Sequence, residues 1–175
     1  MDIVTNSGSA LTGSNGVSVN PLESPTSTFV LLIPDEYVGC ILGRGGSTIR
    51  RLQWQTHTTI RVSNADEPFY PGTEFRMVSI ISNSTAAMDA ATQLILMQVA
   101  MNYSRHFKSV SVVIPDSMAG RVIGKGGERI GEIRQCCANA ELSDRDGDER
   151  IMTIAGRVEQ ICKATRMVID LVFHD

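Results

Sequence analysis

The 175-residue chain has few aromatic residues, no long apolar segment and no excess of basic charge. Aromatic residues make up 5% of it, and 16 Lys and Arg stand against 19 Asp and Glu, for a net charge of −3. This balance argues against indiscriminate binding to polyanions, so a nucleic-acid function would depend on where the basic side chains lie. No run reaches the roughly 18 apolar residues of a membrane span, and the start MDIVTNSGSA lacks the basic region of a secretory signal. We therefore expect no membrane partner.

Metal and redox motifs are also absent from the sequence. The cysteines form no C-x-x-C pair, and only three histidines accompany them. This pattern does not match the spacing of zinc ligands, and adjacent Cys136 and Cys137 are poor disulfide partners. We therefore interpret Cys40, Cys136, Cys137 and Cys162 as reduced, mostly packed thiols of an intracellular protein, nuclear, cytoplasmic or both. We expect no cofactor, no metal and, without a nucleophile–base constellation, no enzymatic activity.

The sequence does contain an internal duplication. IPDEYVGCILGRGGSTIRRL, residues 33–52, aligns with IPDSMAGRVIGKGGERIGEI, residues 114–133, at an offset of 81 residues. The Ile-Pro-Asp start, four glycines and a later isoleucine are identical in the two copies. The duplication predicts four segments along the chain: a disordered N-terminal segment 1–27 rich in Ser, Thr, Gly, Asn and Pro, a first domain 28–103, a short linker 104–108 and a second domain 109–174.

Both units are predicted to share one order of elements, β-α-α-β-β-α. Short β-branched runs closed by proline predict the first strands, and Asp35 and Asp116 are candidate N-caps of the short helices that follow. Alternation with period two predicts a middle strand through Ile60 and Val62, and its counterpart through Ala140 and Leu142. The predicted fold class is α+β, with a three-stranded antiparallel sheet packed by three helices in each unit. The remaining predicted ranges are strands 29–33, 110–114, 76–81 and 150–154, and helices 47–56, 128–136, 85–101 and 157–172.

The glycine clusters interrupt the two short helices and need a local explanation, because a glycine inside a helix costs about 1 kcal/mol relative to alanine. A Walker P-loop does not fit, because 120–125 is one residue short and glycine follows the lysine. A dinucleotide fingerprint does not fit either, because Thr48 and Arg129 stand where its third glycine belongs. A G-x-x-G turn between two helices does fit. It would bring a bare backbone, a helix N-terminus and the basic residue Arg44 or Lys125 against a sugar–phosphate chain.

The motifs resemble tandem type I KH domains. Ile-Pro-Asp is followed by Gly-x-x-[IL]-Gly-[RK]-Gly-Gly-x-x-Ile in both units. The second unit, with GKGGERIGEIRQ and DERIMTIAG, is similar to the KH domains of poly(C)-binding proteins and heterogeneous nuclear ribonucleoprotein K. The first unit, with IPDEYVGCILGRGG, resembles those of far-upstream-element-binding proteins to the same degree. The resemblance covers residues 28–174 and implies that each unit binds about four nucleotides of single-stranded RNA in a groove.

The resemblance also assigns candidate nucleic-acid-binding residues. The apolar floor of the first groove is assigned to Gly39, Cys40, Leu42, Ile49, Ile60 and Val62, and that of the second to Gly120, Arg121, Ile123, Ile130 and Leu142. The two loops contribute Gly43, Arg44, Gly45 and Gly46, and Gly124, Lys125, Gly126 and Gly127. An arginine that reads base edges in the family matches Arg134 in the second unit, where the first has Gln53. A family arginine that opens the third strand matches Arg76 and Arg150.

Three departures from the family pattern are visible. Family members commonly end the second helix in glycine, whereas this chain has His57 there in the first unit and Cys137-Ala138 in the second. The middle strand of the second unit is reached one residue early. Trp54 is expected to pack partly on its own helix, on a face directed away from the groove.

Two other functions stay open at this level. Single-stranded DNA differs as a ligand only at contacts to the 2′-hydroxyl. A protein-interaction or dimerisation scaffold built on the same folds would suit the acidic composition, with self-association or a protein partner bound through the closing helices, which carry Met88, Met97, Met101 and Met167.

Overall fold

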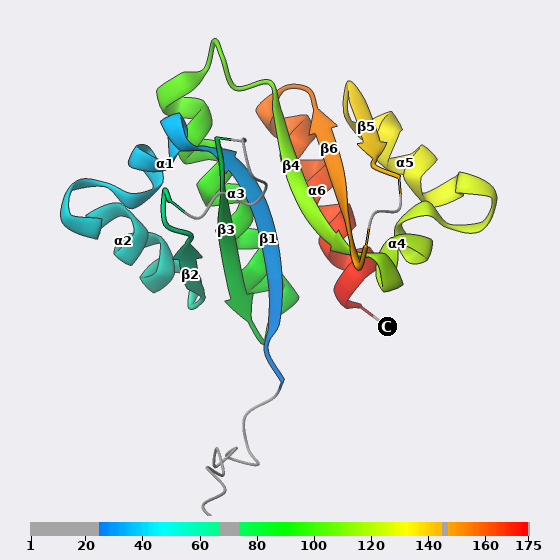
Figure 1. Cartoon of the computed structure of the whole chain (residues 1–175), viewed down its shortest axis with the longest axis horizontal. Helices are drawn as coiled ribbons and strands as arrows, with labels where there is room; N and C mark the ends of the chain where they lie inside the picture. The colour runs from blue at the N-terminus through cyan, green and yellow to red at the C-terminus, as the bar shows by residue number, and fades with distance from the viewer. Residues whose placement is uncertain (1–24, 67–73, 145–146, 175) are drawn as a thin grey trace, which may run out of the picture.

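The computed structural model describes residues 25–66, 74–144 and 147–174, and it contains two units of the same architecture (Figure 1). The first unit consists of β1 (Ser27–Pro34), α1 (Asp35–Leu42), the 3-10 turn η1 (Arg44–Gly46), α2 (Ser47–Thr56), β2 (Thr59–Val62), β3 (Phe75–Ser82) and α3 (Thr85–Tyr103). The second consists of β4 (Ser109–Pro115), α4 (Asp116–Ile123), η2 (Lys125–Gly127), α5 (Glu128–Cys136), β5 (Asn139–Leu142), β6 (Glu149–Ala155) and α6 (Val158–Phe173). The predicted order and fold class are confirmed. The disorder predicted for 1–27 falls mainly outside the described residues, and β1 begins at Ser27, two residues before the predicted strand.

The starts of the short helices differ from the prediction. Pro34 and Pro115 occupy the N-cap positions, and Asp35 and Asp116 are the first helical residues, with no side-chain cap at either helix. The amide of Asp35 instead donates to the carbonyl of Glu74 at 2.7 Å, and the second unit has an equivalent bond of 2.8 Å. An amide that finds a partner on the neighbouring chain segment does not need a side-chain cap. The aspartates still place negative charge at the positive end of the helix dipole.

The two three-stranded sheets join into one six-stranded antiparallel sheet, in the order β2-β3-β1-β4-β6-β5. The seam is formed by β1 and β4, through the pairs Val30↔Val113, Leu31↔Val112 and Leu32↔Ser111. At the offset of 81 residues, Leu31 is the equivalent of Val112, and each outer pair is the equivalent of the other. The units are therefore related by an approximate twofold axis through the Leu31–Val112 pair, as in an isologous dimer interface. The sequence alone gave no relative orientation for the units.

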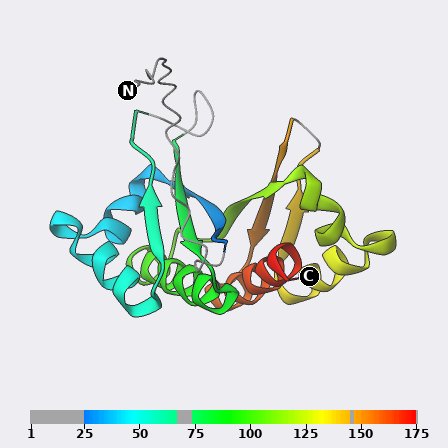
Figure 2. The ribbon, with the colours of Figure 1, turned by 90° about the horizontal axis from the view of Figure 1, so that it is seen from below.

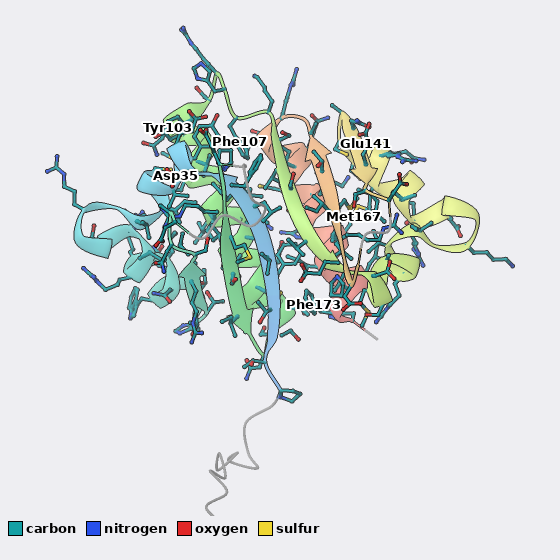
Figure 3. All side chains as sticks on the ribbon, viewed as in Figure 1. Asp35, Tyr103, Phe107, Glu141, Met167 and Phe173 are labelled. Atoms are coloured by element: carbon teal, nitrogen blue, oxygen red, sulfur yellow. The ribbon has the colours of Figure 1, made fainter. Side chains whose placement is uncertain are left out.

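All six α-helices described here cover one face of this sheet, with α3 and α6 side by side beneath the seam (Figure 2). Apolar side chains between the sheet and these helices form one core that runs through both units. Phe29 of β1 and Phe173 of α6 meet edge to face across the seam, with ring centroids 6.2 Å apart. Figure 3 labels Phe173 at the end of α6. None of the described helices combines the length and the apolar character needed to span a membrane.

A polar bridge also joins α3 to α6. The guanidinium of Arg166 donates to Asp89 at 2.8 Å, and the amide of Gln93 donates to both oxygens of the same carboxylate at 2.8 and 2.9 Å. Cys162 lies near this bridge, where burial and, after it, the charges of Asp89 and Glu159 raise the pKa of its thiol to about 11. The thiol is therefore neutral at pH 7, which fits a packed side chain better than a reactive one.

The one-residue difference between the units lies at the end of the second helix. In the first unit, α2 is followed by His57 in the left-handed conformation, with φ 53° and ψ 39°. In the second unit, α5 is one residue shorter, and Cys137 follows it in an extended conformation at φ −129°. The missing residue is thus the left-handed one, and β5 still pairs so that Ala140 faces Ile154, as Ile60 faces Ile80. The predicted deletion preserves the inward side of the strand.

Replacing His57 with glycine should stabilise the protein. His57 is exposed and adopts a positive φ, which disfavours side chains other than glycine. Glycine loses more backbone entropy on folding than histidine, which offsets part of this gain. We therefore expect His57→Gly to raise the free energy of unfolding by about 0.5–1 kcal/mol in urea titrations. The control Cys137→Gly should lower it by about 1–2 kcal/mol, since that residue is buried and has negative φ. A loss of stability in His57→Gly would refute this explanation.

Candidate functional site

The first glycine of each loop is required by packing. Gly43 has φ 71°, and a Cβ atom there would lie 2.2 Å from Oγ1 of Thr48 and 2.8 Å from its backbone nitrogen. Gly124 has φ 74°, and its Cβ would lie 2.9 Å from the backbone nitrogen of Arg129. Such distances exclude any side chain without a movement of the backbone. These glycines therefore allow the chain to turn from the short helix directly into the second one.

The second glycine of each loop has the opposite environment. Gly45 and Gly126 have φ of 56° and 62°, and a Cβ atom at either would meet nothing within 4 Å. Their backbone is therefore open to an approaching molecule, and no internal contact explains the absence of a side chain. The neighbouring Arg44 and Lys125 are exposed, and within the described residues neither forms an ion pair.

Each loop leads directly into a helix N-terminus. Gly46 and Gly127 are the left-handed N-cap residues of α2 and α5, and neither provides a side chain to cap the first amides. The first amides instead donate to carbonyls of the turn, that of Ser47 to Arg44 and that of Glu128 to Lys125. The positive end of the helix dipole still favours an anion at this point. Ser47 opens α2, whereas Glu128 opens α5 and offsets part of this field in the second unit. The glycine loops lie at the two opposite ends of the molecule (Figure 1).

The side chains predicted to read bases bridge the second helix to the edge strand. Oε1 of Gln53 accepts a hydrogen bond from the amide of Ile60 at 2.8 Å, which leaves its amide nitrogen as the group available to a ligand. Nε of Arg134 donates to the carbonyl of Ala140 at 2.9 Å, which leaves its two terminal nitrogens. Both residues therefore have fixed orientations beside the strand edge and offer hydrogen-bond donors there. Arg134 gives the second unit a positive charge at this position, where the first unit has the neutral Gln53.

Arg76 and Arg150 are engaged within their own units. Nε and Nη2 of Arg76 donate to the carbonyl of Ser63 at 2.8 and 2.5 Å, and Nη1 lies 3.1 Å from a carboxylate oxygen of Asp35. Arg150 donates to the carbonyl of Ser143 in the same way, at 2.8 and 2.5 Å. Ser63 and Ser143 were not among the predicted site residues, and only their identical place after the middle strand would have indicated them. The hydrogen bonds of each arginine thus hold the end of the middle strand against the start of the third strand.

The predicted groove floor divides into exposed and buried positions. Ile60 and Ile130 are only 4% and 7% exposed and belong to the core, so they support the floor from beneath. The partly buried residues at its surface are Cys40, Leu42, Ile49 and Val62 in the first unit, with Ile123 and Leu142 in the second. Gly39 and Gly120 are exposed on α1 and α4, and a Cβ atom there would meet nothing within 4 Å. Arg121 donates to the carbonyl of His174, which ties the end of α6 to the second groove.

Two side chains of α2 lie differently from the sequence-based expectation. Trp54 is 77% exposed, although partial packing on its helix was expected. Arg50 was not among the predicted site residues, but a Cβ atom at Gly46 would lie 3.0 Å from its Nη1, so its guanidinium rests beside the glycine loop. Its place one helical turn after the loop was the sequence signal that could have identified it. Burial also raises the pKa of the Cys40 thiol, so this part of the floor is uncharged at neutral pH.

Comparison with known proteins gives one family match. The KH domain family model matches residues 28–97 and 109–170. The chain is 32% identical over 170 residues to the human RNA-binding protein Nova-2, covering 83% of this chain and 34% of that protein. It is 30% identical over 164 residues to the Drosophila melanogaster RNA-binding protein Pasilla, covering 83% and 21%. The chain thus spans about a third or less of the length of these relatives. Among solved structures, it resembles the first KH domain of human vigilin, at 21% identity and a TM-score of 0.38, over 53% of this chain and 94% of that one.

Proposed function

The chain belongs to the KH-domain family, and on that premise we propose that it binds single-stranded RNA in two grooves, one in each unit. KH domains bind nucleic acid and form a non-enzymatic family, and both relatives above are RNA-binding proteins. We further propose that it acts inside the cell, nuclear, cytoplasmic or both, in post-transcriptional regulation of RNA. Membership of the poly(C)-binding, ribonucleoprotein K or far-upstream-element-binding groups stays a prediction, which the base preference of the bound RNA will test.

The observation that carries this proposal is the shape of the glycine loops. Gly45 and Gly126 adopt positive φ with open space where a side chain would stand, and each is preceded by an exposed cation and followed by an uncapped helix. A bare backbone, a cation and the positive end of a helix dipole together suit the phosphates of a nucleic-acid backbone.

The proposed contacts follow from this geometry. The loops hold the phosphates, the exposed floor residues pack against bases, and Gln53 and Arg134 donate hydrogen bonds to base edges. Arg76 and Arg150 position the middle strands, because their guanidiniums are already occupied by backbone carbonyls.

A protein-interaction scaffold is the second candidate, and one observation favours it. Met97 and Met101 are 48% and 80% exposed and line an apolar hollow of about 820 Å³ between α3 and the start of α6. Ten apolar residues of these two helices are buried within the chain, nine of them at 0% exposure. This burial removes much of the sequence-based reason for expecting self-association through the closing helices.

The affinity for RNA at two salt concentrations distinguishes these functions. If phosphates are bound, the logarithm of the affinity should fall with the logarithm of the salt concentration, by about 0.7 for each phosphate contacted. The measurement is fluorescence anisotropy with a single-stranded RNA recovered by selection from a random pool, and the DNA of the same sequence serves as the comparison. A scaffold would show no RNA binding at either salt concentration. Tighter binding to the DNA would assign the grooves to single-stranded DNA instead.

A further inference from the structure

The outward side of α2 carries three large side chains that the groove does not use. Arg50, Arg51 and Trp54 are all exposed, and we call them the α2 face. Trp54 is the only tryptophan of the chain, and at 77% exposure it contributes almost nothing to the core. Tryptophan is highly buried on average, so an indole left in solvent between two cations needs an explanation other than folding.

The α2 face begins beside the first groove. With about 100° of rotation per helical residue, Arg50 lies about 60° around α2 from Gln53, Trp54 about 100° and Arg51 about 160°, all in one direction. Gln53 is fixed at the groove by its bond to the amide of Ile60. The α2 face therefore starts at the groove wall and leads away from it. The guanidinium of Arg50 also lies beside Gly46, so the α2 face continues to the glycine loop.

The charge of the α2 face is uncompensated. The helix sequence STIRRLQWQT contains no acidic residue, and in the described part of the chain neither Arg50 nor Arg51 forms an ion pair. Two cations beside an exposed aromatic ring complement the phosphates and bases of a single strand, in which each base has a face that can stack. An apolar protein partner would match the indole but would leave the two guanidiniums without partners.

The second unit lacks this face, although it keeps the rest of the helix. At the offset of 81 residues, Arg50, Arg51 and Trp54 correspond to Gly131, Glu132 and Gln135 of α5. The buried positions are conserved in character between the two helices, with Leu52 in one and Ile133 in the other. The fold therefore does not require two arginines and a tryptophan on this surface.

We propose that the α2 face is a second binding surface for single-stranded nucleic acid, which holds the nucleotides that leave the first groove. One base stacks on Trp54, while Arg50 and Arg51 bind the flanking phosphates. The inference rests on the proposed function, because the strand must first occupy the groove. Since stacking tolerates every base, this surface should add affinity and footprint length without adding sequence preference.

The test uses the full chain with the second loop disabled by Lys125→Asp and Gly126→Asp, so that binding reports the first unit. The probe is the tetranucleotide core that selection recovers on this protein, alone or extended by about four adenosines on its 5′ or 3′ side. Because Trp54 is the only tryptophan, its emission reports this surface directly. Binding is measured in parallel by anisotropy for Trp54→Ala, Trp54→Phe, and the matched α5 control Gln135→Ala.

We expect one of the two extended RNAs, but not the tetranucleotide, to quench Trp54 emission and to bind more tightly. Trp54→Ala should lose about 5- to 100-fold in affinity for that RNA and nothing for the tetranucleotide. Trp54→Phe should recover part of the loss, and Gln135→Ala should behave as the parent. Replacing Arg50 with glutamine should reduce the salt slope by about 0.7.

Failure of this inference and failure of the proposed function give different results. If the tetranucleotide binds but neither extension changes affinity or emission, the inference is overturned while the proposed function stands, and a protein becomes the better candidate for the occupant of the α2 face. If selection recovers no RNA at all, the proposed function fails and the inference fails with it.

Discussion

Arg44→Asp combined with Gly45→Asp is expected to abolish binding in the first groove, and Lys125→Asp with Gly126→Asp to abolish it in the second. Each pair replaces a cation with an anion and adds a second anion where the backbone would touch a phosphate. Placing like charges together costs several kcal/mol, so we expect a loss of at least about 100-fold in each groove. The protein with all four substitutions should bind no single-stranded RNA in anisotropy titrations.

The same positions provide a control that separates charge from folding. The asparagine pairs Arg44→Asn with Gly45→Asn, and Lys125→Asn with Gly126→Asn, have the size of the aspartate pairs without their charge. Both residue types tolerate the left-handed conformation, and a side chain at either glycine points into open space. Thermal unfolding should therefore be similar for the two sets of variants, whereas the asparagine variants should retain part of the affinity. Equal loss in both sets would show that the loops act through their shape and that phosphate charge is unimportant.

The elements of each unit could be predicted from local sequence because local physics determines them. The second helices begin and end where the sequence indicates, Ser47–Thr56 and Glu128–Cys136, since the glycines stop the preceding helix and the apolar spacing continues afterwards. The caps were predicted less well, because the amide of Asp35 finds its partner on Glu74, far along the chain. His57 stands where family members carry glycine, and in the structure it adopts the left-handed conformation that glycine accommodates.

The relation between the units could not be predicted, because strand pairing at the seam depends on three residue pairs with no distinctive sequence. Val30, Leu31 and Leu32 would suit a buried central strand or a half-covered edge equally well. The exposure of Trp54 could not be predicted either, since apolar spacing alone places an aromatic residue near a helix surface without fixing what covers it. The nucleic-acid-binding role of Arg76 and Arg150 stays a prediction, and their partners in the structure are backbone carbonyls that no sequence motif reveals.

The second expected result concerns RNAs that carry two groove-binding sites. The strands beside the grooves, β2 and β5, are the two edges of the six-stranded sheet, so five strand spacings of about 4.8 Å, or about 24 Å, separate them. The approximate twofold axis also reverses the direction of one groove relative to the other. A single RNA must therefore span the sheet and turn back before it can fill both grooves.

This geometry predicts a threshold in spacer length. Two adjoining sites should bind no more tightly than one, because the strand cannot reach both grooves. Once the spacer is long enough, the second site binds at a high effective concentration, and affinity should rise by about 10²- to 10⁴-fold before it declines slowly with further length. The aspartate pair in either loop should abolish this gain and leave the affinity of a single site.

The central claim, that two grooves at opposite ends of one continuous sheet bind one RNA, is tested most directly by measuring the affinity of such RNAs as the spacer is lengthened. The dissociation constant is determined by anisotropy, with two copies of the selected site joined by uridine spacers of zero to about twenty nucleotides. We expect no gain at zero spacer, a steep gain at an intermediate length, and loss of that gain when either loop carries the aspartate pair. A gain already complete without a spacer, or one that survives the loss of either loop, would contradict it.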